Sequence, residues 1–374
     1  MAGIYLHIPF CKQACSYCNF HFTTSLRYKD DLVKAIAKEI ETEKDYTAGE
    51  EINTIYFGGG TPSILSIQDC ELLIGSIRHQ YAVTPDAEIT LEANPDDITR
   101  EKVRGWKQLG VNRLSIGIQS FFEEELKWMN RAHTAAHARE CIEIAYEEGI
   151  HNLSIDLIYG SPLLTDAMWE QNVKTAINYN VPHLSCYALT VEEKTPLHKQ
   201  IASHAKEKVD DEKQGRQFLL LMDWLKTAGY EHYEVSNFSK PGMRSKHNSS
   251  YWKGEKYLGV GPSAHSYNGD ERRWNVYNNS VYIKGVEQGA PMREVEVLTK
   301  EQQFNEYVMI SLRTIEGVSM EEIEKRWGVE WRVFVERMLQ SYVKDELVAA
   351  NKNNLTLTNK GKLFADGIAS DLFV

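Results

Sequence analysis

Three cysteines lie close together near the N-terminus, in the run CKQACSYC at residues 11–18. Thiolates at this spacing can ligate zinc or an iron–sulfur cluster from one short loop. A 4Fe-4S cubane normally takes four cysteine ligands, so three would leave one iron for an outside ligand. An open coordination position allows a metal centre to do chemistry. The spacing therefore predicts a reactive metal site at Cys11, Cys15 and Cys18.

A structural zinc ion is the alternative for the same loop. Three cysteines and one histidine, such as His7 or His21, would complete a tetrahedral zinc site. The loop, however, follows the first expected strand, at the end of a parallel sheet where active sites are built. This position favours the cluster over the zinc site.

Repeated strand–helix units must position the loop. Short β-branched runs alternate with amphipathic segments up to about residue 238, which is typical of a parallel sheet. The runs predict strands at residues 3–9, 52–57, 88–93, 112–119, 153–159 and 183–190, and a seventh run at 230–238 is expected to extend the sheet. Helices are expected at residues 27–42, 67–81, 100–109, 135–148, 166–178 and 211–228. Six units are fewer than the eight of a closed barrel, so we predict an α/β fold with a partial (β/α)6 barrel.

Glycines and polar residues recur where the expected strands end. The second strand runs into GGGTP at residues 58–62. It could form a turn capped by Thr61, but the glycines also let a ligand approach the backbone. Glu92 and Gln119 lie at the ends of the next two strands, and Asp156 lies within the fifth, in SIDLIYG. Each alone could simply complete a strand, whereas together they predict a polar rim that suits hydroxyl and ammonium groups.

The pattern C-x-x-x-C-x-x-C after a first strand resembles the signature of the radical S-adenosylmethionine (SAM) superfamily. The longer run YLHIPFCKQACSYC, residues 5–18, resembles its oxygen-independent coproporphyrinogen III oxidase-like family, and the similarity extends over essentially the whole chain. The resemblance implies a 4Fe-4S cluster whose fourth iron binds SAM. It also assigns SAM contacts or cluster shielding to Tyr5, Tyr17, Gly59, Gly60, Thr61, Glu92, Gln119, Arg131 and Asp156.

Two branches of this family differ at two motifs. Coproporphyrinogen III dehydrogenases carry a further cysteine two residues after the last cluster ligand, where this chain has Phe20. The heme chaperone branch carries H-N-x-x-Y-W, which stands here at residues 247–252. The resemblance therefore implies a heme chaperone that transfers heme to an acceptor protein. The radical SAM dehydrogenase, which decarboxylates coproporphyrinogen III, is the alternative, and no catalytic residue is assigned.

The histidine motif predicts a heme site at His247, Tyr251 and Trp252. A neutral imidazole is a good axial ligand for heme iron, and nearby Arg244 and Lys246 could pair with the propionates. The alternative is that His247 and Trp252 only hold a loop against the barrel. A second histidine, His265 in GVGPSAHSY, lies in a segment that the resemblance places near SAM, and no role is assigned to it.

Composition limits the class of protein. The 374 residues include 42 Lys and Arg against 53 Asp and Glu, a net charge of -11, which argues against a general nucleic-acid-binding surface. Six cysteines are too few for a disulfide scaffold, and no run approaches the roughly 20 apolar residues of a membrane span. We therefore expect a cytoplasmic protein whose membrane contact is at most peripheral. The heme acceptor that the resemblance implies is an unknown protein, such as one of the respiratory chain.

The chain is expected to fall into three parts. Residues 1–238 would form the radical SAM partial barrel. Residues 239–300 are rich in Gly, Asn, Ser and Tyr and would form a loop-rich covering segment. Residues 301–374 predict a small α+β, winged-helix-like module. This module has more acidic than basic residues, which favours a structural or docking role over DNA binding.

Overall fold

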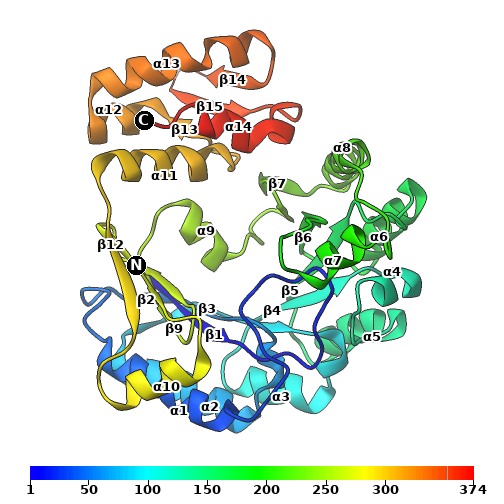
Figure 1. Cartoon of the computed structure of the whole chain (residues 1–374), viewed down its shortest axis with the longest axis vertical. Coiled ribbons are helices and arrows are strands. Elements are labelled where there is room, and N and C mark those ends of the chain that lie inside the picture. The colour runs from blue at the N-terminus through cyan, green and yellow to red at the C-terminus, as the bar shows by residue number, and fades with distance from the viewer. Residues whose placement is uncertain (352) are drawn as a thin grey trace.

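The first six strands of the protein form one parallel run, in the order β1 to β6. The computed structural model describes residues 1–351 and 353–374 (Figure 1). The six strands are β1 (Ala2–Ile8), β2 (Ile52–Gly59), β3 (Val83–Ala93), β4 (Arg113–Gln119), β5 (Asn152–Tyr159) and β6 (His183–Ala188). They confirm the expected parallel sheet, although β3 begins earlier than the sequence predicts.

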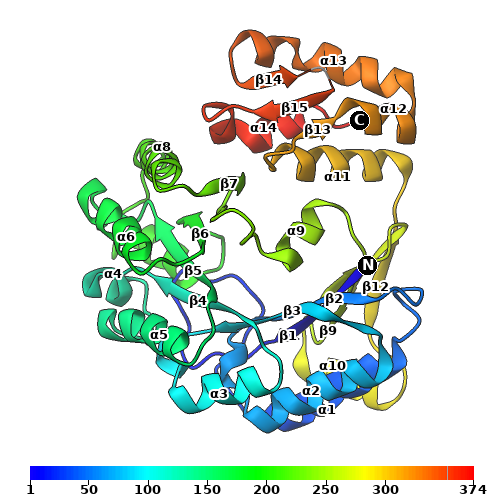
Figure 2. The same ribbon diagram turned by 180° about the vertical axis from the view of Figure 1, so that it is seen from behind.

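Helices cover the outer side of this curved sheet (Figures 1 and 2). They are α1 (Lys29–Thr42), α2 (Ile67–Gln80), α3 (Arg100–Gln108), α5 (Ala135–Glu147), α6 (Asp166–Asn178) and α8 (Asp211–Thr227). Two short helices, α4 (Glu123–Trp128) and α7 (Pro196–Ala202), instead pack in a separate apolar cluster with Tyr17 of the cysteine segment. Ser66 and Thr134 start α2 and α5 with reciprocal capping hydrogen bonds, which satisfy backbone N–H groups at the helix starts. The short α4 and α7 were not expected from the sequence.

The parallel strands have one apolar and one polar face. On β4, Leu114, Ile116 and Ile118 pack into the core beneath the helices. Successive side chains of a strand point to opposite faces, so Arg113 and Ser115 face the concave side. The same alternation brings further polar side chains to this inner face, namely Tyr5, His7, Tyr56, Glu92, Asp156 and His183.

Further strands extend both ends of the parallel sheet. The expected seventh run forms a hairpin, β7 (Glu231–Glu234) and β8 (Asn237–Ser239), and β8 pairs with β6. At the other end, β9 (Tyr257–Val260) runs parallel to β1. It is followed in the sheet by β10 (His265–Tyr267), β11 (Glu271–Asn275) and β12 (Arg293–Val297), which gives twelve strands in all among the described residues.

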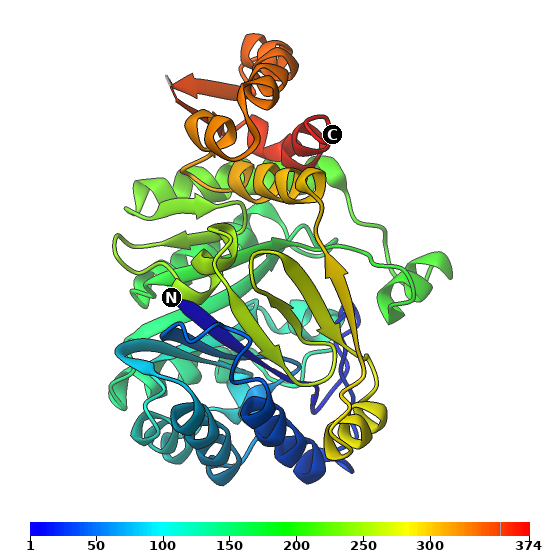
Figure 3. The same ribbon diagram turned by 90° about the vertical axis from the view of Figure 1, so that its left-hand side faces the viewer.

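The loop-rich expectation for residues 239–300 needs correction. This segment holds four strands and two helices, α9 (Lys246–Trp252) and α10 (Asn279–Glu287). Its strands are three to five residues long, too short for a clear alternation. Of these strands, only β9 pairs with β1, and β10, β11 and β12 are then added one after another by antiparallel pairing, which fixes their register. In the side view of Figure 3, the yellow strands lie in front of the parallel sheet.

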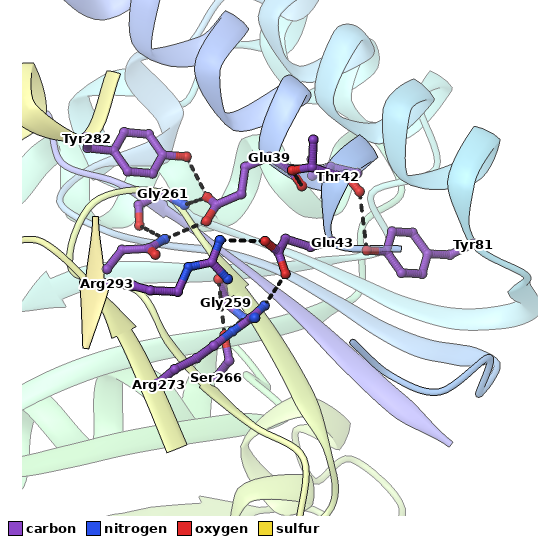
Figure 4. A network of polar contacts seen from close by, with 12 residues as sticks. Glu39, Thr42, Glu43, Tyr81, Gly259, Gly261, Ser266, Arg273, Tyr282 and Arg293 are labelled. Atoms are coloured by element: carbon purple, nitrogen blue, oxygen red, sulfur yellow. Dashed lines mark hydrogen bonds and ion pairs between the residues drawn. The ribbon is translucent and has the colours of Figure 1, made fainter. Parts of the chain in front are cut away.

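Two glutamates of α1 attach this segment to the barrel (Figure 4). Glu39 accepts hydrogen bonds from three of its donors, Gly261 N at 2.8 Å, Asn275 Nδ2 at 2.7 Å and Tyr282 Oη at 2.5 Å. One turn later, Glu43 binds Arg273 and Arg293, each at 2.5 Å. Because Glu39 is buried, these contacts replace the water that its carboxylate loses.

The C-terminal part forms a small α+β domain with its own apolar core, as expected. It contains α11 (Lys300–Leu312), α12 (Met320–Trp327), α13 (Val329–Lys344) and α14 (Ala365–Ser370) around strands β13 (Val318–Ser319), β14 (Val348–Asn351) and β15 (Asn354–Leu357). Backbone hydrogen bonds dock it onto the β7 hairpin, from Val235 N to Arg313 O and from Ile315 N to Tyr233 O. No helix in the described part of the chain is both long enough and apolar enough to cross a membrane.

Candidate functional site

The cysteine loop, residues 9–28, lies at the C-terminal ends of the parallel strands. Its backbone is anchored to segments that follow β4 and β6: Ser16 N donates to Met129 O at 3.0 Å, and Leu197 N donates to Ser16 O at 2.7 Å. All three cysteines of the loop are half-buried free thiols. The fold thus brings the loop to the edge of the sheet where the sequence predicts the chemistry.

Two of the thiols, Cys11 and Cys18, lie in an environment that opposes their ionisation. Burial raises the pKa of Cys11, and it raises the pKa of Cys18 to about 11. A thiol must lose its proton to bind iron, so burial has to be offset by a cation. Arg131 Nη1 donates to Cys15 Sγ at 3.1 Å, and Thr61 Oγ1 donates to Cys11 Sγ at 3.4 Å. Arg131 supplies part of that charge, and bound iron would supply the rest.

The histidines considered for a zinc site are occupied by other contacts. Both ring nitrogens of His7 are hydrogen-bonded, Nδ1 to Tyr5 Oη and Nε2 to His21 O, each at 3.1 Å. His21 Nε2 contacts Asn279 Oδ1 at 2.8 Å. Within residues 1–351 and 353–374, no three His, Cys, Asp or Glu side chains are grouped around one possible ion position. The donor set that the loop itself offers is thus three thiols, which fits a cluster ligated through sulfur.

The glycine run after β2 packs against the start of the cysteine loop. Gly60 N donates to Ile8 O at 2.9 Å, and Thr61 N donates to Phe10 O at 2.7 Å. A Cβ at residue 60 would lie 2.7 Å from Phe10 O, and Gly59 has a φ of +106°, which only glycine adopts easily. These glycines are therefore required by the protein's own packing. Thr61 is not a side-chain cap, because its hydroxyl binds Cys11 instead.

Arg131 links the cysteine loop to the ends of β3 and β4. Besides Cys15, its guanidinium donates to Asn94 Oδ1 and Gly117 O, each at 2.7 Å. Its Nε is buried and has no partner among the described residues. Gln119 ends β4 nearby with a φ of +65°, and a Cβ at residue 117 would touch both side chains. A buried N–H without a partner beside a strained strand end suits an anionic ligand group such as a carboxylate.

Two carboxyl groups lie deeper in the concave face. Burial raises the pKa of Glu92 to about 7, opposed by the hydrogen bond from Tyr56 Oη at 2.8 Å. Burial also raises the pKa of Asp156 to about 6. Arg113 acts on both in the opposite direction, since its charge favours the ionised carboxylates. The pair can therefore accept hydrogen bonds from a ligand near neutral pH.

The two tyrosines expected to shield the cluster are both half-buried. Burial raises the pKa of each, so both phenols stay protonated at neutral pH. Tyr17 packs against an apolar cluster that includes Leu126 and Leu197. Tyr5 lies on β1 beside His7 and is stacked on Tyr56, with ring centroids 6.1 Å apart. The fold thus brings every residue expected around SAM to the same strand ends or to the concave face beneath them.

His247 of the H-N-x-x-Y-W motif is fully buried inside this face. Its Nδ1 contacts Thr54 Oγ1 and its Nε2 contacts Tyr251 Oη, each at 2.8 Å. Its ring also stacks on Tyr56, with centroids 5.0 Å apart. Burial lowers the pKa of His247 to about 3, so the imidazole is neutral. This arrangement matches the alternative in which His247 holds α9 against the barrel.

Tyr251 and Trp252 of the same motif line a cavity of about 590 Å³. The cavity lies between the cysteine loop, β9, β10 and α11. Its other walls include Phe20, His21, His265 and several tyrosines. Phe20 is 68% exposed, which is unusual for a large apolar side chain. The structure therefore places the two aromatic residues of the motif, but not its histidine, at a surface that a ligand can reach.

Sequence reasoning missed several inner-face residues, above all Arg113. This guanidinium is 1% exposed, and its Nε and Nη1 have no partner among the described residues. Asn94 and Tyr56, which bind Arg131 and Glu92, were missed as well. The strand sequences did indicate this polar inner face, because polar residues alternate with apolar ones in each strand. A strand covered by helices on one side only has a second face available for ligands.

Comparison with known proteins agrees with this architecture. Residues 5–176 match the radical SAM superfamily, and residues 298–364 match the HemN C-terminal domain. The solved structure described as coproporphyrinogen III oxidase (HemN) from Escherichia coli, a radical SAM enzyme, superposes with a TM-score of 0.84. It is 24% identical, and the match covers 100% of this chain and 90% of the other. The fold is thus that of a radical SAM protein with a HemN-type C-terminal domain.

Curated relatives narrow the class further. The heme chaperone HemW of Bacillus subtilis is 33% identical over 371 residues, which cover 98% of each chain. HemW of Escherichia coli is 37% identical over 273 residues, which cover 70% of this chain and 69% of that protein. The protein belongs to the HemW family.

Proposed function

We propose that this protein is a heme chaperone, which binds heme, carries a SAM-ligated 4Fe-4S cluster and passes the heme to an acceptor protein. The observation that carries the proposal is the full-length similarity to HemW proteins, together with Phe20 at the position where the dehydrogenases have a cysteine. The aromatic cavity beside the cysteine loop offers room for a flat ligand.

The cluster would be held by Cys11, Cys15 and Cys18. A cubane with one iron free of protein ligands can bind SAM and supplies one-electron chemistry when SAM is bound. Arg131 would neutralise the sulfurs and bind the SAM carboxylate through its unpartnered Nε. The remaining SAM contacts would come from Tyr5, Tyr17, Gly59, Gly60, Thr61, Glu92, Gln119 and Asp156.

Heme would bind in the cavity lined by Tyr251 and Trp252, with His247 behind them. The acceptor would be a heme protein of unknown identity, such as one of the respiratory chain. We place this exchange in the cytoplasm, with at most peripheral membrane contact. Nucleic acid is no partner in this proposal, because the chain carries a net charge of -11.

Hemin titration of the purified full chain tests the heme step. We expect a shifted Soret band, which Trp252→Ala weakens by about tenfold because an aromatic wall of the cavity is lost. Trp224→Ala, on the outer helix α8, serves as the control for loss of a tryptophan elsewhere. Absence of a Soret shift in the unaltered protein would contradict the proposal.

Anaerobic reconstitution tests the cluster. We expect iron and sulfide in the protein, and an electron paramagnetic resonance signal of the reduced cluster that changes when SAM is added. Zinc without iron or sulfide would support the zinc alternative. Formation of protoporphyrinogen from coproporphyrinogen III, with SAM and dithionite present, would support the dehydrogenase instead.

A further inference from the structure

The cavity beside the cysteine loop contains a histidine that is available for iron, and it is not the histidine of the H-N-x-x-Y-W motif. His247 is 0% exposed, and both of its ring nitrogens are hydrogen-bonded. To ligate iron it would have to break contacts with Thr54 and Tyr251 and leave its stack on Tyr56. Breaking the two hydrogen bonds opposes ligation, because the buried hydroxyls of Thr54 and Tyr251 would lose their partner. Leaving the stack on Tyr56 would also remove an aromatic contact.

His265 is placed differently. It is the first residue of β10, its side chain is exposed, and it lines the cavity directly. Its Nε2 has one long contact, to Tyr277 Oη at 3.3 Å, and Nδ1 has no hydrogen bond among the described residues. Its ring is supported from one side by Trp274, with centroids 5.7 Å apart and planes inclined by 24°. An imidazole that is supported but weakly bonded can exchange its contact for a bond to iron at small cost.

The other two histidines of the cavity are less available. His7 is 6% exposed and has contacts at both ring nitrogens. His21 contacts Asn279 Oδ1 at 2.8 Å and meets Tyr277 edge-on. Among the cavity histidines, His265 therefore has the weakest competing contacts.

The walls of the cavity fit a planar conjugated ring. Six aromatic side chains besides Phe20 line it, namely Tyr5, Tyr251, Trp252, Tyr257, Tyr267 and Tyr277. Aromatic side chains stack on flat π-systems and keep water away from them. The volume of about 590 Å³ lies within the range of cofactor-sized sites.

A neighbouring cavity of about 730 Å³ offers positive charge for the propionates. The two cavities share lining residues, among them Trp252, Gly254 and Glu306, so they adjoin. Lys253 and Arg326 line the second cavity, and neither forms an ion pair among the described residues. Of the acidic residues that line it, Glu306, Glu316 and Asp86 are paired with Arg272, Arg244 and Lys246. Glu255 and Glu322 have no ion pair among the described residues, so the propionates would have to lie nearer to Lys253 and Arg326 than to these two carboxylates. A porphyrin in the first cavity could direct its propionate groups toward Lys253 and Arg326.

We propose that heme lies in this cavity with His265 as its axial ligand and with its propionates directed toward Lys253 and Arg326. His247 holds Tyr251 in the cavity wall and does not bind the iron. This inference rests on the proposed heme-binding function, and it identifies the cavity and the ligand that serve it.

Ligand replacement tests the assignment. Ferric hemin is titrated into the full chain, His265→Ala, His265→Cys and His247→Ala, with His79→Ala on the exposed face of α2 as the matched histidine control. We expect His265→Ala to weaken hemin binding by about tenfold. His265→Cys should give the spectrum of a thiolate-ligated heme, visible in the ferrous carbon monoxide complex. His247→Ala should keep the spectrum of histidine ligation even where its affinity falls.

The outcomes separate this inference from the function on which it rests. If the unaltered protein binds hemin but the His265→Cys spectrum is unchanged, the ligand assignment is wrong and heme binding stands. Loss of histidine ligation in His247→Ala, with His265 variants unaffected, would likewise overturn it. If the unaltered protein does not bind hemin, the heme chaperone proposal itself fails. Circular dichroism of each variant distinguishes unfolding from loss of the ligand.

Discussion

Glu92 and Asp156 face the same interior, and each is less acidic than in water because burial disfavours its charge. Arg113, which has unpartnered nitrogens and lies on the neighbouring strand β4, partly restores the charged form. The concave face therefore combines groups of opposite charge that are incompletely paired with each other. Such groups are costly for folding and are typical of ligand sites.

Glu92→Gln should separate two effects of the buried carboxylate, namely the destabilisation of the folded protein and the binding of a ligand. A carboxyl whose pKa rises from 4.5 to about 7 on folding adds stability below about pH 4.5, and this stability is lost as the pH rises through 7. Glutamine can keep the hydrogen bond from Tyr56 without the charge. At about pH 8 we expect the free energy of unfolding of the variant to be about 1 to 2 kcal/mol larger than that of the unaltered protein. This difference in stability should vanish in acid.

Urea titrations across this pH range measure the difference. Glu71→Gln, on the exposed face of α2, is the control for loss of one surface charge. A difference that does not change with pH would contradict the buried-carboxyl explanation. If Glu92 also binds SAM, the same variant should bind SAM more weakly although it is more stable.

At the scale of elements, α1 connects the parallel barrel to the strands that extend it (Figure 4). Glu39 satisfies three buried donors from residues 261–282, and no other acceptor is recorded for the Tyr282 hydroxyl in the described chain. These donors come from the segment that also carries His265. The helix therefore determines where that histidine lies relative to the cysteine loop.

Glu39→Ala should loosen this attachment. It leaves three buried donors without an acceptor, and we expect a loss of about 2 to 4 kcal/mol in the free energy of unfolding. Amide hydrogen exchange should increase first in residues 257–297, because their contacts with α1 are removed. Glu41→Ala, an exposed position on the same helix, should have little effect. Equal unfolding midpoints for the two variants would show that the network adds no stability.

At the scale of the whole molecule, the candidate heme cavity adjoins the candidate cluster site. Asn19, Phe20 and His21 follow the last cysteine directly and line the cavity. Glu306 and Ile310 of α11 close it from the side of the C-terminal domain. Ligands at the two sites would thus share one wall, so each should alter the affinity of the other.

Cluster assembly should therefore change hemin binding. We expect the reconstituted protein to bind hemin about fivefold more tightly than the iron-free protein, because ligation orders the shared wall. The combined variant Cys11→Ser, Cys15→Ser and Cys18→Ser, carried through the same reconstitution, should show no such gain. Calorimetric titration of both proteins makes the comparison. Equal gains with and without the cysteines would contradict coupling through the loop.

Local patterns in the sequence predicted much of the barrel. The six parallel strands and their main helices follow from the periodicity of apolar residues, and the cysteine loop lies at the predicted strand ends. The alternation of polar residues in the same strands also indicated the inner face that holds Arg113, although this signal was missed. Each of these features depends on residues that are close in the chain.

The heme side of the site could not be predicted in the same way. The sequence pattern predicted a heme site at His247, whereas the fold buries this side chain behind Tyr251 and brings His265 to the cavity surface. The strands from β9 to β12 were also missed, because such short sequences form strands only when a neighbouring strand is present: β9 pairs with β1, and the other three pair in succession from β9.

The sequence alone thus determined the class of fold and the candidate metal-binding loop, since spacing and periodicity act over a few residues. Only the tertiary structure decided which histidine lines a cavity and which carboxylates share one interior. Burial and hydrogen-bond partners arise from contacts between segments far apart in the chain, and these contacts decide whether a side chain is available for chemistry.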